Sequence, residues 1–109
     1  MLNDVGPMFE ALADPTRRHV VQLLSDGPRR AGEISDSAGI SSPRMSRHLR
    51  VLLNAGIVID ERSPDDARVR VFRLCPDSIV AVQAWLDQVQ AHWSEQLHSF
   101  KRHLEGRRP

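Results

Sequence analysis

The apolar residues of this chain repeat with a helical period along most of its length. Four early segments place their apolar side chains three or four positions apart, which is typical of amphipathic helices packed on a core. These segments are residues 7–13, 15–25, 31–38 and 41–55. Asp14 and Ser41 are good N-cap residues for the second and fourth segments, and Gly39 and Gly56 end the third and fourth. The first half of the chain therefore predicts four helices.

The pattern changes to that of β-strands after Gly56. Residues 57–59 are Ile, Val and Ile, and β-branched side chains favour a strand. Apolar and basic residues then alternate in a second predicted strand, whose apolar side carries Val69, Val71 and Leu74, with Arg70 and Arg73 between them. The intervening residues 62–68 include Pro, Ser and Asp, which favour turns. We therefore expect a β-hairpin with a charged tip, a wing, over about residues 57–74.

A long amphipathic helix is predicted over about residues 77–105. Its apolar residues form a heptad-like stripe made of Val82, Leu86, Val89, Trp93, Leu97, Phe100 and Leu104. A monomer could fold this helix over its own core. However, about 27 residues that each rise roughly 1.5 Å reach roughly 40 Å, which exceeds the width of a domain of this size. We therefore expect part of the stripe to pack against a second copy of the chain.

The predicted helices at 31–38 and 41–55 form a further pattern, because a short helix, a tight glycine turn and a capped second helix are typical of a helix-turn-helix. In the second of these helices the core side carries Met45, Leu49, Leu52 and Leu53, and the outward side carries Arg44, Arg47 and Arg50, with Ser46 at its flank. The outward residues of such a helix contact base edges in the major groove. An ordinary amphipathic surface helix is the alternative interpretation.

These elements predict a fold that is mainly α with a small β-hairpin: a winged helix-turn-helix with a long C-terminal dimerisation helix. Residues 1–109 are expected to form one domain, because this length leaves little room for a second core. On the wing, Arg68 and Arg70 are expected to contact DNA phosphates or the minor groove. The expected dimer interface joins the first and last helices through Met8, Phe9, Leu12, Val82, Trp85, Leu86, Val89 and Trp93.

Charge and composition support a DNA-binding globular protein without requiring one. The net charge is only +1, but residues 40–73 contain seven arginines and four acids, a local excess of +3. A solvated basic surface is the plainer explanation of that excess. No apolar run approaches the roughly 20 residues of a membrane span, and the N-terminus does not resemble a signal peptide. The single cysteine, Cys75, fits a reducing compartment, so we expect a cytoplasmic location.

Three stretches together resemble the ArsR family of winged helix-turn-helix repressors. They are ALADPTRR at 11–18, SSPRMSRHLRVL at 41–52 and AGIV at 55–58, and the resemblance runs from about residue 8 to residue 74. It implies a dimer formed through the first and last helices, which represses transcription and releases DNA when an effector binds. It also implies that Ser42, Arg44, Ser46 and Arg47 lie in the major groove. His48 is expected to point back toward the core and to be structural.

The chain departs from the metal-sensing members of that family. Arg30 and Gly32 occupy the positions of their Cys-x-Cys pair, and Val89 replaces the histidine of their Asp-x-His pair, which would begin at Asp87. His92, His98, His103 and Glu105 do not restore the partner spacing. Glu95 and His98 leave an unusual site across a dimer open, but zinc needs about four ligands. We therefore expect exposed histidines, and no metal or other cofactor. Cys75 is expected to act as a small apolar residue rather than in redox chemistry.

Other function classes find less support in the sequence. No Gly-x-Ser-x-Gly, phosphate-binding loop or His-Glu-x-x-His is present, so the chain is not expected to be an enzyme. A winged helix that binds only proteins is the main alternative, but such a module does not need outward arginines on its second helix. An activator or a nucleoid-type DNA binder stays open.

Overall fold

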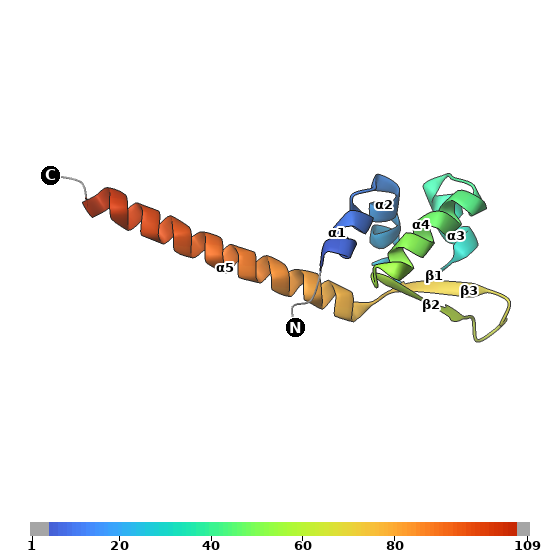
Figure 1. Cartoon of the computed structure of the whole chain (residues 1–109). Helices are drawn as coiled ribbons and strands as arrows, with labels where there is room; N and C mark the ends of the chain where they lie inside the picture. Colours follow the sequence, from blue (N-terminus) through green and yellow to red (C-terminus); the bar gives the residue numbers. More distant parts are fainter. Residues whose placement is uncertain (1–4, 107–109) are drawn as a thin grey trace.

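The computed structural model describes residues 5–106 of the chain. Its elements are α1 (Gly6–Leu12), α2 (Pro15–Leu24), β1 (Arg29–Arg30), α3 (Ala31–Ala38), α4 (Ser42–Asn54), β2 (Val58–Arg62), β3 (Arg70–Leu74) and α5 (Pro76–Gly106). Helices α1 to α4 gather beside a small sheet, and α5 leaves this body as a single long helix (Figure 1). All five predicted helices are present, and no helix end differs from its predicted position by more than one residue.

Local chemistry explains where the helices begin and end. The Asp14 carboxylate accepts hydrogen bonds from the backbone N–H groups of Thr16 at 2.8 Å and Arg17 at 3.2 Å, which satisfies two free donors of α2. Ser41 caps α4 in the same way by accepting from the N–H of Arg44 at 3.4 Å. Gly39 ends α3 with a φ of 68°, a left-handed conformation that a residue without a Cβ adopts most easily.

The sheet has three antiparallel strands in the order β1-β3-β2. The β2–β3 hairpin is the predicted wing, and its register runs from Val58 opposite Leu74 to Arg62 opposite Arg70. The third strand, β1, pairs Arg29 with Phe72, and the sequence analysis did not predict it. Two residues are too few to show a strand period, so only the tertiary pairing reveals this strand.

The predicted inward side of the second wing strand is confirmed for Leu74, which packs against the core, but is wrong for Val69 and Val71. Phe72 is the buried residue of β3, at 1% exposure, whereas Val69 and Val71 are only partly buried. Side chains alternate along a strand, so Arg70, Phe72 and Leu74 share the face that meets the core. This register buries the large Phe72 ring together with Leu74 in place of the two valines. Arg70 is accommodated on that face because its guanidinium lies over the Phe72 ring, 5.0 Å from the centroid.

One hydrophobic core lies between the helices and the sheet. Its buried residues come from all of the first four helices, from the start of the wing and from β3: Ala11, Val20, Leu24, Ile34, Met45, Leu49, Leu52, Ile57, Val58 and Phe72. Ile57 is buried in the short connection between α4 and β2. The predicted core side of α4 is confirmed for Met45, Leu49 and Leu52, and Leu53 packs against the same core.

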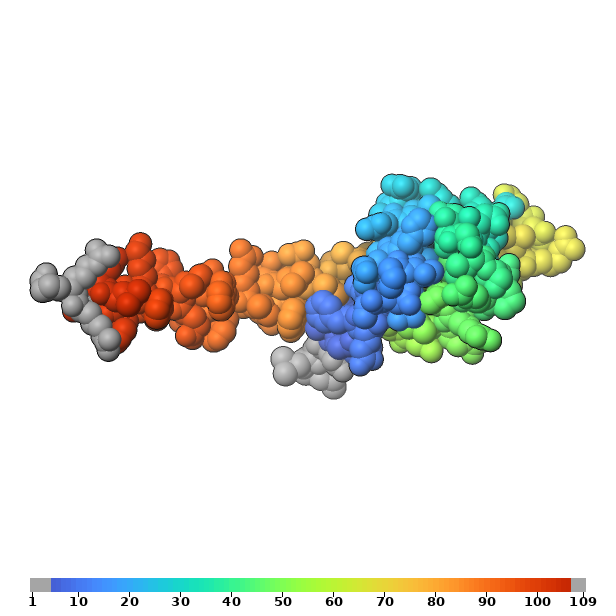
Figure 2. Space-filling model, turned by 90° about the horizontal axis from the view of Figure 1, so that it is seen from above, coloured from blue at the N-terminus to red at the C-terminus, as the bar shows by residue number. Residues whose placement is uncertain are grey.

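Among residues 5–106, the contacts that anchor α5 to the body come from its first turns and the residue before it. The Ser78 hydroxyl donates to the Gly56 carbonyl, the Cys75 N–H donates to Ile57 O at 2.8 Å, and the Phe9 and Trp85 rings meet edge to face at 5.1 Å. Beyond its first turns the helix projects away from the body, as Figures 1 and 2 show. Its exposed apolar residues include Leu86, Val89, Trp93, Leu97, Phe100 and Leu104.

No helix in the described part of the chain is long and apolar enough to span a membrane.

Candidate nucleic-acid interface

The turn between α3 and α4 fixes how α4 is presented. Gly39 reverses the chain, and the N–H of Ile40 donates to Ser35 O at 3.3 Å, so α4 starts at a fixed angle to α3. Met45, Leu49 and Leu52 then hold the inner face of α4 in the core at exposures of 3% or less. Because three successive turns are buried on one side, the opposite side must face solvent.

That outer side of α4 carries three unpaired guanidinium groups. Arg44, Arg47 and Arg50 are all exposed. Within residues 5–106 none of their side chains makes a hydrogen bond or an ion pair, and no acidic residue belongs to α4 itself. Ser42 and Ser46 are exposed on the same helix. The five residues that the sequence assigns to the recognition helix are therefore all accessible to a partner.

The wing arginines lie in a different electrostatic setting, because acids of the wing hold them. The Arg68 Nε is 3.1 Å from Asp66 Oδ1, the Arg70 Nε is 2.9 Å from Asp60 Oδ2, and the Arg73 Nε is 3.3 Å from Glu61 Oε1. The Arg68 guanidinium, followed by its backbone N–H, lowers the pKa of the Asp66 carboxyl below its ordinary value. Much of the positive charge predicted for the wing is thus balanced within it.

One further wing arginine is free of an acidic partner among the described residues, and the sequence did not single it out as a DNA-binding residue. Arg62 is exposed at the end of β2, opposite Arg70, and makes no ion pair within the described residues. Its position at the start of the predicted loop was the available signal, but loop residues have no period that shows which way they face.

Helix α4 lies between two hollows. On the wing side a hollow of about 360 Å³ is lined by residues that include Ser46, Arg50, Asn54 and Arg70. On the α2 side a hollow of about 260 Å³ is lined by Arg17, Arg44, Arg47, His48 and Val51. Both hollows are bordered by guanidinium groups, and neither lining contains an acidic residue. We call the second one the α2–α4 hollow.

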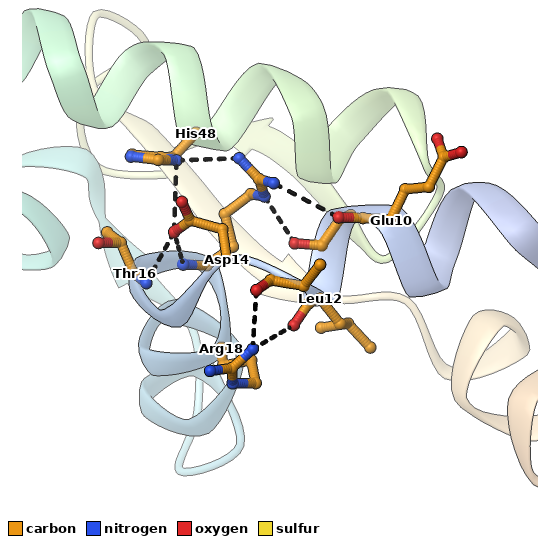
Figure 3. Close-up of polar contacts among 9 residues, drawn as sticks. Glu10, Leu12, Asp14, Thr16, Arg18 and His48 are labelled. Atoms are coloured by element: carbon orange, nitrogen blue, oxygen red, sulfur yellow. Dashed lines mark hydrogen bonds and ion pairs between the residues drawn. The ribbon is translucent and has the colours of Figure 1, made fainter.

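A polar junction behind this hollow joins α1, α2 and α4 (Figure 3). The Arg17 side chain donates to Ala11 O at 2.6 Å through Nε and to Glu10 O at 3.4 Å through Nη2, while its Nη1 lies 3.2 Å from His48 Nδ1. Arg18 satisfies two more carbonyls at the end of α1, those of Leu12 and Ala13. The junction therefore supplies the partners that the C-terminus of α1 lacks.

His48 and Asp14 complete the junction. The His48 side chain is 19% exposed and lies at the edge of α4, with its Nδ1 4.0 Å from Asp14 Oδ1. It therefore borders the α2–α4 hollow rather than pointing into the core as expected. Burial raises the pKa of the Asp14 carboxyl. Hydrogen bonds from the Arg17 and Thr16 N–H groups, and the nearby His48 and Arg17 charges, lower that pKa, and the net shift is downward.

The predicted dimer residues lie along one continuous edge. Met8 and Leu12 are partly buried and line a small apolar hollow of about 120 Å³ with Val82, at the point where α1 meets α5. Phe9 and Trp85 contact each other next to it at 38% and 40% exposure. Leu86, Val89 and Trp93 follow along α5 at 45%, 45% and 63% exposure.

No group of three or more metal-ligating side chains occurs among residues 5–106.

Comparisons with known proteins agree with this geometry. Residues 14–60 match the profile described as bacterial regulatory protein, arsR family. The chain is 35% identical over 98 residues to HTH-type transcriptional regulator Rv2034 of Mycobacterium tuberculosis, which covers 90% of this chain and 86% of that protein. It is 42% identical over 55 residues to transcriptional repressor SdpR of Bacillus subtilis, covering 50% and 61% of the two chains.

A solved structure shows the same fold at similar sequence identity. The crystal structure of the ArsR family transcriptional regulator RHA00566 superposes with a TM-score of 0.75 at 31% identity, and the match covers 86% of this chain and 97% of that one. The likeness thus extends over most of both chains.

Proposed function

The chain belongs to the ArsR family of regulatory proteins, and from that premise we propose that it is a homodimeric repressor of transcription. It binds an inverted repeat in double-stranded DNA in the cytoplasm, and an effector molecule releases it. Helix α4 enters the major groove, and the wing lies beside the groove.

The unpaired arginines of α4 are the observation that carries this function. Arg44, Arg47 and Arg50 have no acidic partner within the described residues, although most arginines of the wing do. Arg47 stands near the middle of the outward face, where a guanidinium can bond guanine O6 and N7 together. Arg44 and Arg50 lie on its two sides, each next to one hollow, and phosphate oxygens are their natural partners.

The exposed stripe of α5 supports the dimer. Apolar side chains of this size gain about 1.5–3 kcal/mol each when they are removed from water, so an uncovered row along a projecting helix is costly. A second copy offers a matching stripe, because a two-fold interface uses the same surface on both subunits. Two recognition helices related by a two-fold axis then require half-sites about 10 bp, or a multiple of it, apart.

Selection of bound duplexes from a random pool tests this function. The expected result is an inverted repeat recovered by the wild-type protein. The variant Arg44→Ala/Arg47→Ala/Arg50→Ala serves as the control, since it keeps the core side of α4 and should recover no common sequence. Recovery of an unsymmetrical site, or of the same site by the triple variant, would contradict the proposal.

A further inference from the structure

The contact between His48 and Arg17 fixes the hydrogen-bonding state of the His48 imidazole. Its Nδ1 lies 3.2 Å from Nη1 of Arg17, and a guanidinium can only donate. Nδ1 must therefore accept this bond, which places the proton of the neutral ring on Nε2. The Asp14 carboxylate, 4.0 Å from Nδ1, is beyond hydrogen-bond distance and already accepts from the N–H groups of Thr16 and Arg17.

The Nε2–H group of His48 is available to a ligand. Figure 3 shows the second ring nitrogen of His48 pointing away from Asp14, and within residues 5–106 it has no hydrogen-bond partner. The ring borders the α2–α4 hollow together with Arg44, Arg47 and Arg17. One oriented N–H donor beside three guanidinium groups, in a lining without acidic side chains, is an environment for an anion.

We propose that the α2–α4 hollow binds one phosphodiester group of the DNA backbone, with His48 Nε2–H as a neutral donor and Arg44 as the charged partner. Arg17 is a positioning residue, because it acts on the phosphate through the ring of His48. The inference rests on the proposed function, since a helix in the major groove lies between two phosphate backbones. The hollow that Arg50 and Arg70 line lies on the other side of α4.

Two substitutions of His48 separate its two nitrogen atoms. In His48→Asn the side-chain oxygen lies close to the position of Nδ1 and can still accept from Arg17, but no donor reaches the hollow. In His48→Gln the amide nitrogen lies close to the position of Nε2 and restores the donor. For the selected duplex we expect binding about tenfold weaker with Asn, and within about threefold of wild type with Gln. Sequence preference should not change, because phosphates carry no base information.

Salt dependence separates His48 from Arg44. A neutral donor releases no counterion, so His48→Asn should leave the slope of log K against log salt unchanged, whereas Arg44→Ala should lower it by about one unit. Duplexes with a neutral methylphosphonate at single linkages locate the contact. The wild type should lose about fivefold or more in affinity at one linkage per half-site, and His48→Asn should be insensitive to that same linkage.

The role of Arg17 has a spectroscopic signature. In the ¹⁵N NMR spectrum of the free protein at pH 8, the wild-type His48 ring should show the form protonated at Nε2 only. In Arg17→Met the ring should show a mixture of both forms, and the spectrum of His48→Gln identifies its signals by their loss. A merely structural role of Arg17 would leave the tautomer unchanged. Inorganic phosphate at constant ionic strength tests the other source of the anion, and should neither shift these signals nor displace DNA.

The possible outcomes distinguish this inference from the proposed function. If the wild type binds a selected duplex and His48→Asn binds every duplex equally well, the phosphate site is wrong and the proposed function stands. Displacement by inorganic phosphate would overturn the backbone assignment. If the wild type binds no duplex, both are wrong. If circular dichroism shows that His48→Asn does not fold, Arg44→Ala serves as the test instead. Loss of its sensitivity to the same methylphosphonate linkage would support the phosphate site, and retained sensitivity would contradict it.

Discussion

At the scale of single residues, what distinguishes the arginines of this protein is their partners. Arg44, Arg47 and Arg50 face solvent without an acid, while Arg68 and Arg70 are held by Asp66 and Asp60. An unpaired guanidinium can bind DNA without breaking an ion pair, and a paired one must exchange its carboxylate for a phosphate. The two groups should therefore contribute differently to binding.

Arg47 is expected to read a base. Arg47→Ala should cost about 1–3 kcal/mol of binding free energy and relax the preference at one base position per half-site, because the bidentate contact to guanine is lost. Titration against the selected site and its single-base variants at two salt concentrations measures this. Full retention of sequence preference, with only a smaller salt slope, would assign Arg47 to a phosphate instead.

Asp66 is expected to weaken DNA binding, because it occupies Arg68 and places a negative charge at the tip of the wing. Asp66→Asn should strengthen binding to all sequences alike and increase the salt slope by up to about one unit. The matched control is Asp26→Asn, an exposed acid at the end of α2, which should change neither quantity. Equal or weaker binding by Asp66→Asn would show that the ion pair itself holds Arg68 in its DNA-binding position.

Part of this residue-level picture was predictable from the sequence. The outward face of α4 follows from its helical period, because Met45, Leu49 and Leu52 leave only one side for the arginines. The ion pairs of the wing do not follow, since they join residues that the hairpin register brings together, such as Asp60 and Arg70. His48 falls at the boundary of the helical wheel, where periodicity does not decide between core and surface.

At the scale of elements, the ends of helices were predicted well because capping chemistry is local. Asp14 and Ser41 cap the helices that the sequence assigned to them. The wing was predicted less well. Its inward face depends on which side chains the core accepts, and the large Phe72 ring takes the place expected for Val71. The pairing of β1 with β3 is non-local and has no signal in two residues.

The Asp14 cap gives a stability prediction with a defined pH dependence. Asp14→Ala should lower the free energy of unfolding by about 1 kcal/mol at pH 7, because two N–H groups of α2 lose their acceptor. The folded-state pKa of Asp14 is lowered, so its contribution is present above its unfolded value of about 3.9 and is lost as the pH falls below it. Urea denaturation of both proteins at pH 7 and near pH 3 measures this difference.

A matched control for the cap is Asp26→Asn, which should change the free energy of unfolding by no more than a few tenths of a kcal/mol at either pH. If Asp14→Ala is as stable as the wild type at pH 7, or if the difference between them grows as the pH falls, the capping account is wrong.

At the scale of the whole molecule, the shape itself requires a partner. The chain measures 74 by 29 by 22 Å, because α5 extends well beyond the body that its first turns contact. The length of the stripe already predicted this projection from the sequence. How the two stripes cross could not be predicted, because a heptad pattern specifies a face of the helix but not the orientation of its partner.

The dimer prediction is tested on the stripe of α5. Leu86→Asp/Val89→Asp should give monomers in sedimentation and much weaker DNA binding, because burying two unpaired carboxylates is costly. Gln88→Asp/Ala91→Asp is the control, since it adds the same charges at the same spacing on the opposite side of the helix. This control should stay dimeric, and a Leu86/Val89 variant that also stays a tight dimer would contradict the assignment.

Two copies of this chain are expected to read one symmetric site, and the spacing between its half-sites shows whether they do. The affinity of the wild-type protein is measured for the selected duplex and for versions with 5 or 10 bp inserted at its centre. Five base pairs rotate one half-site to the opposite face of the duplex, so affinity should fall by about a hundredfold or more, with two chains bound per intact site. Unchanged affinity after the 5 bp insertion, or one chain bound per intact site, would show that the protein does not bind as a symmetric dimer.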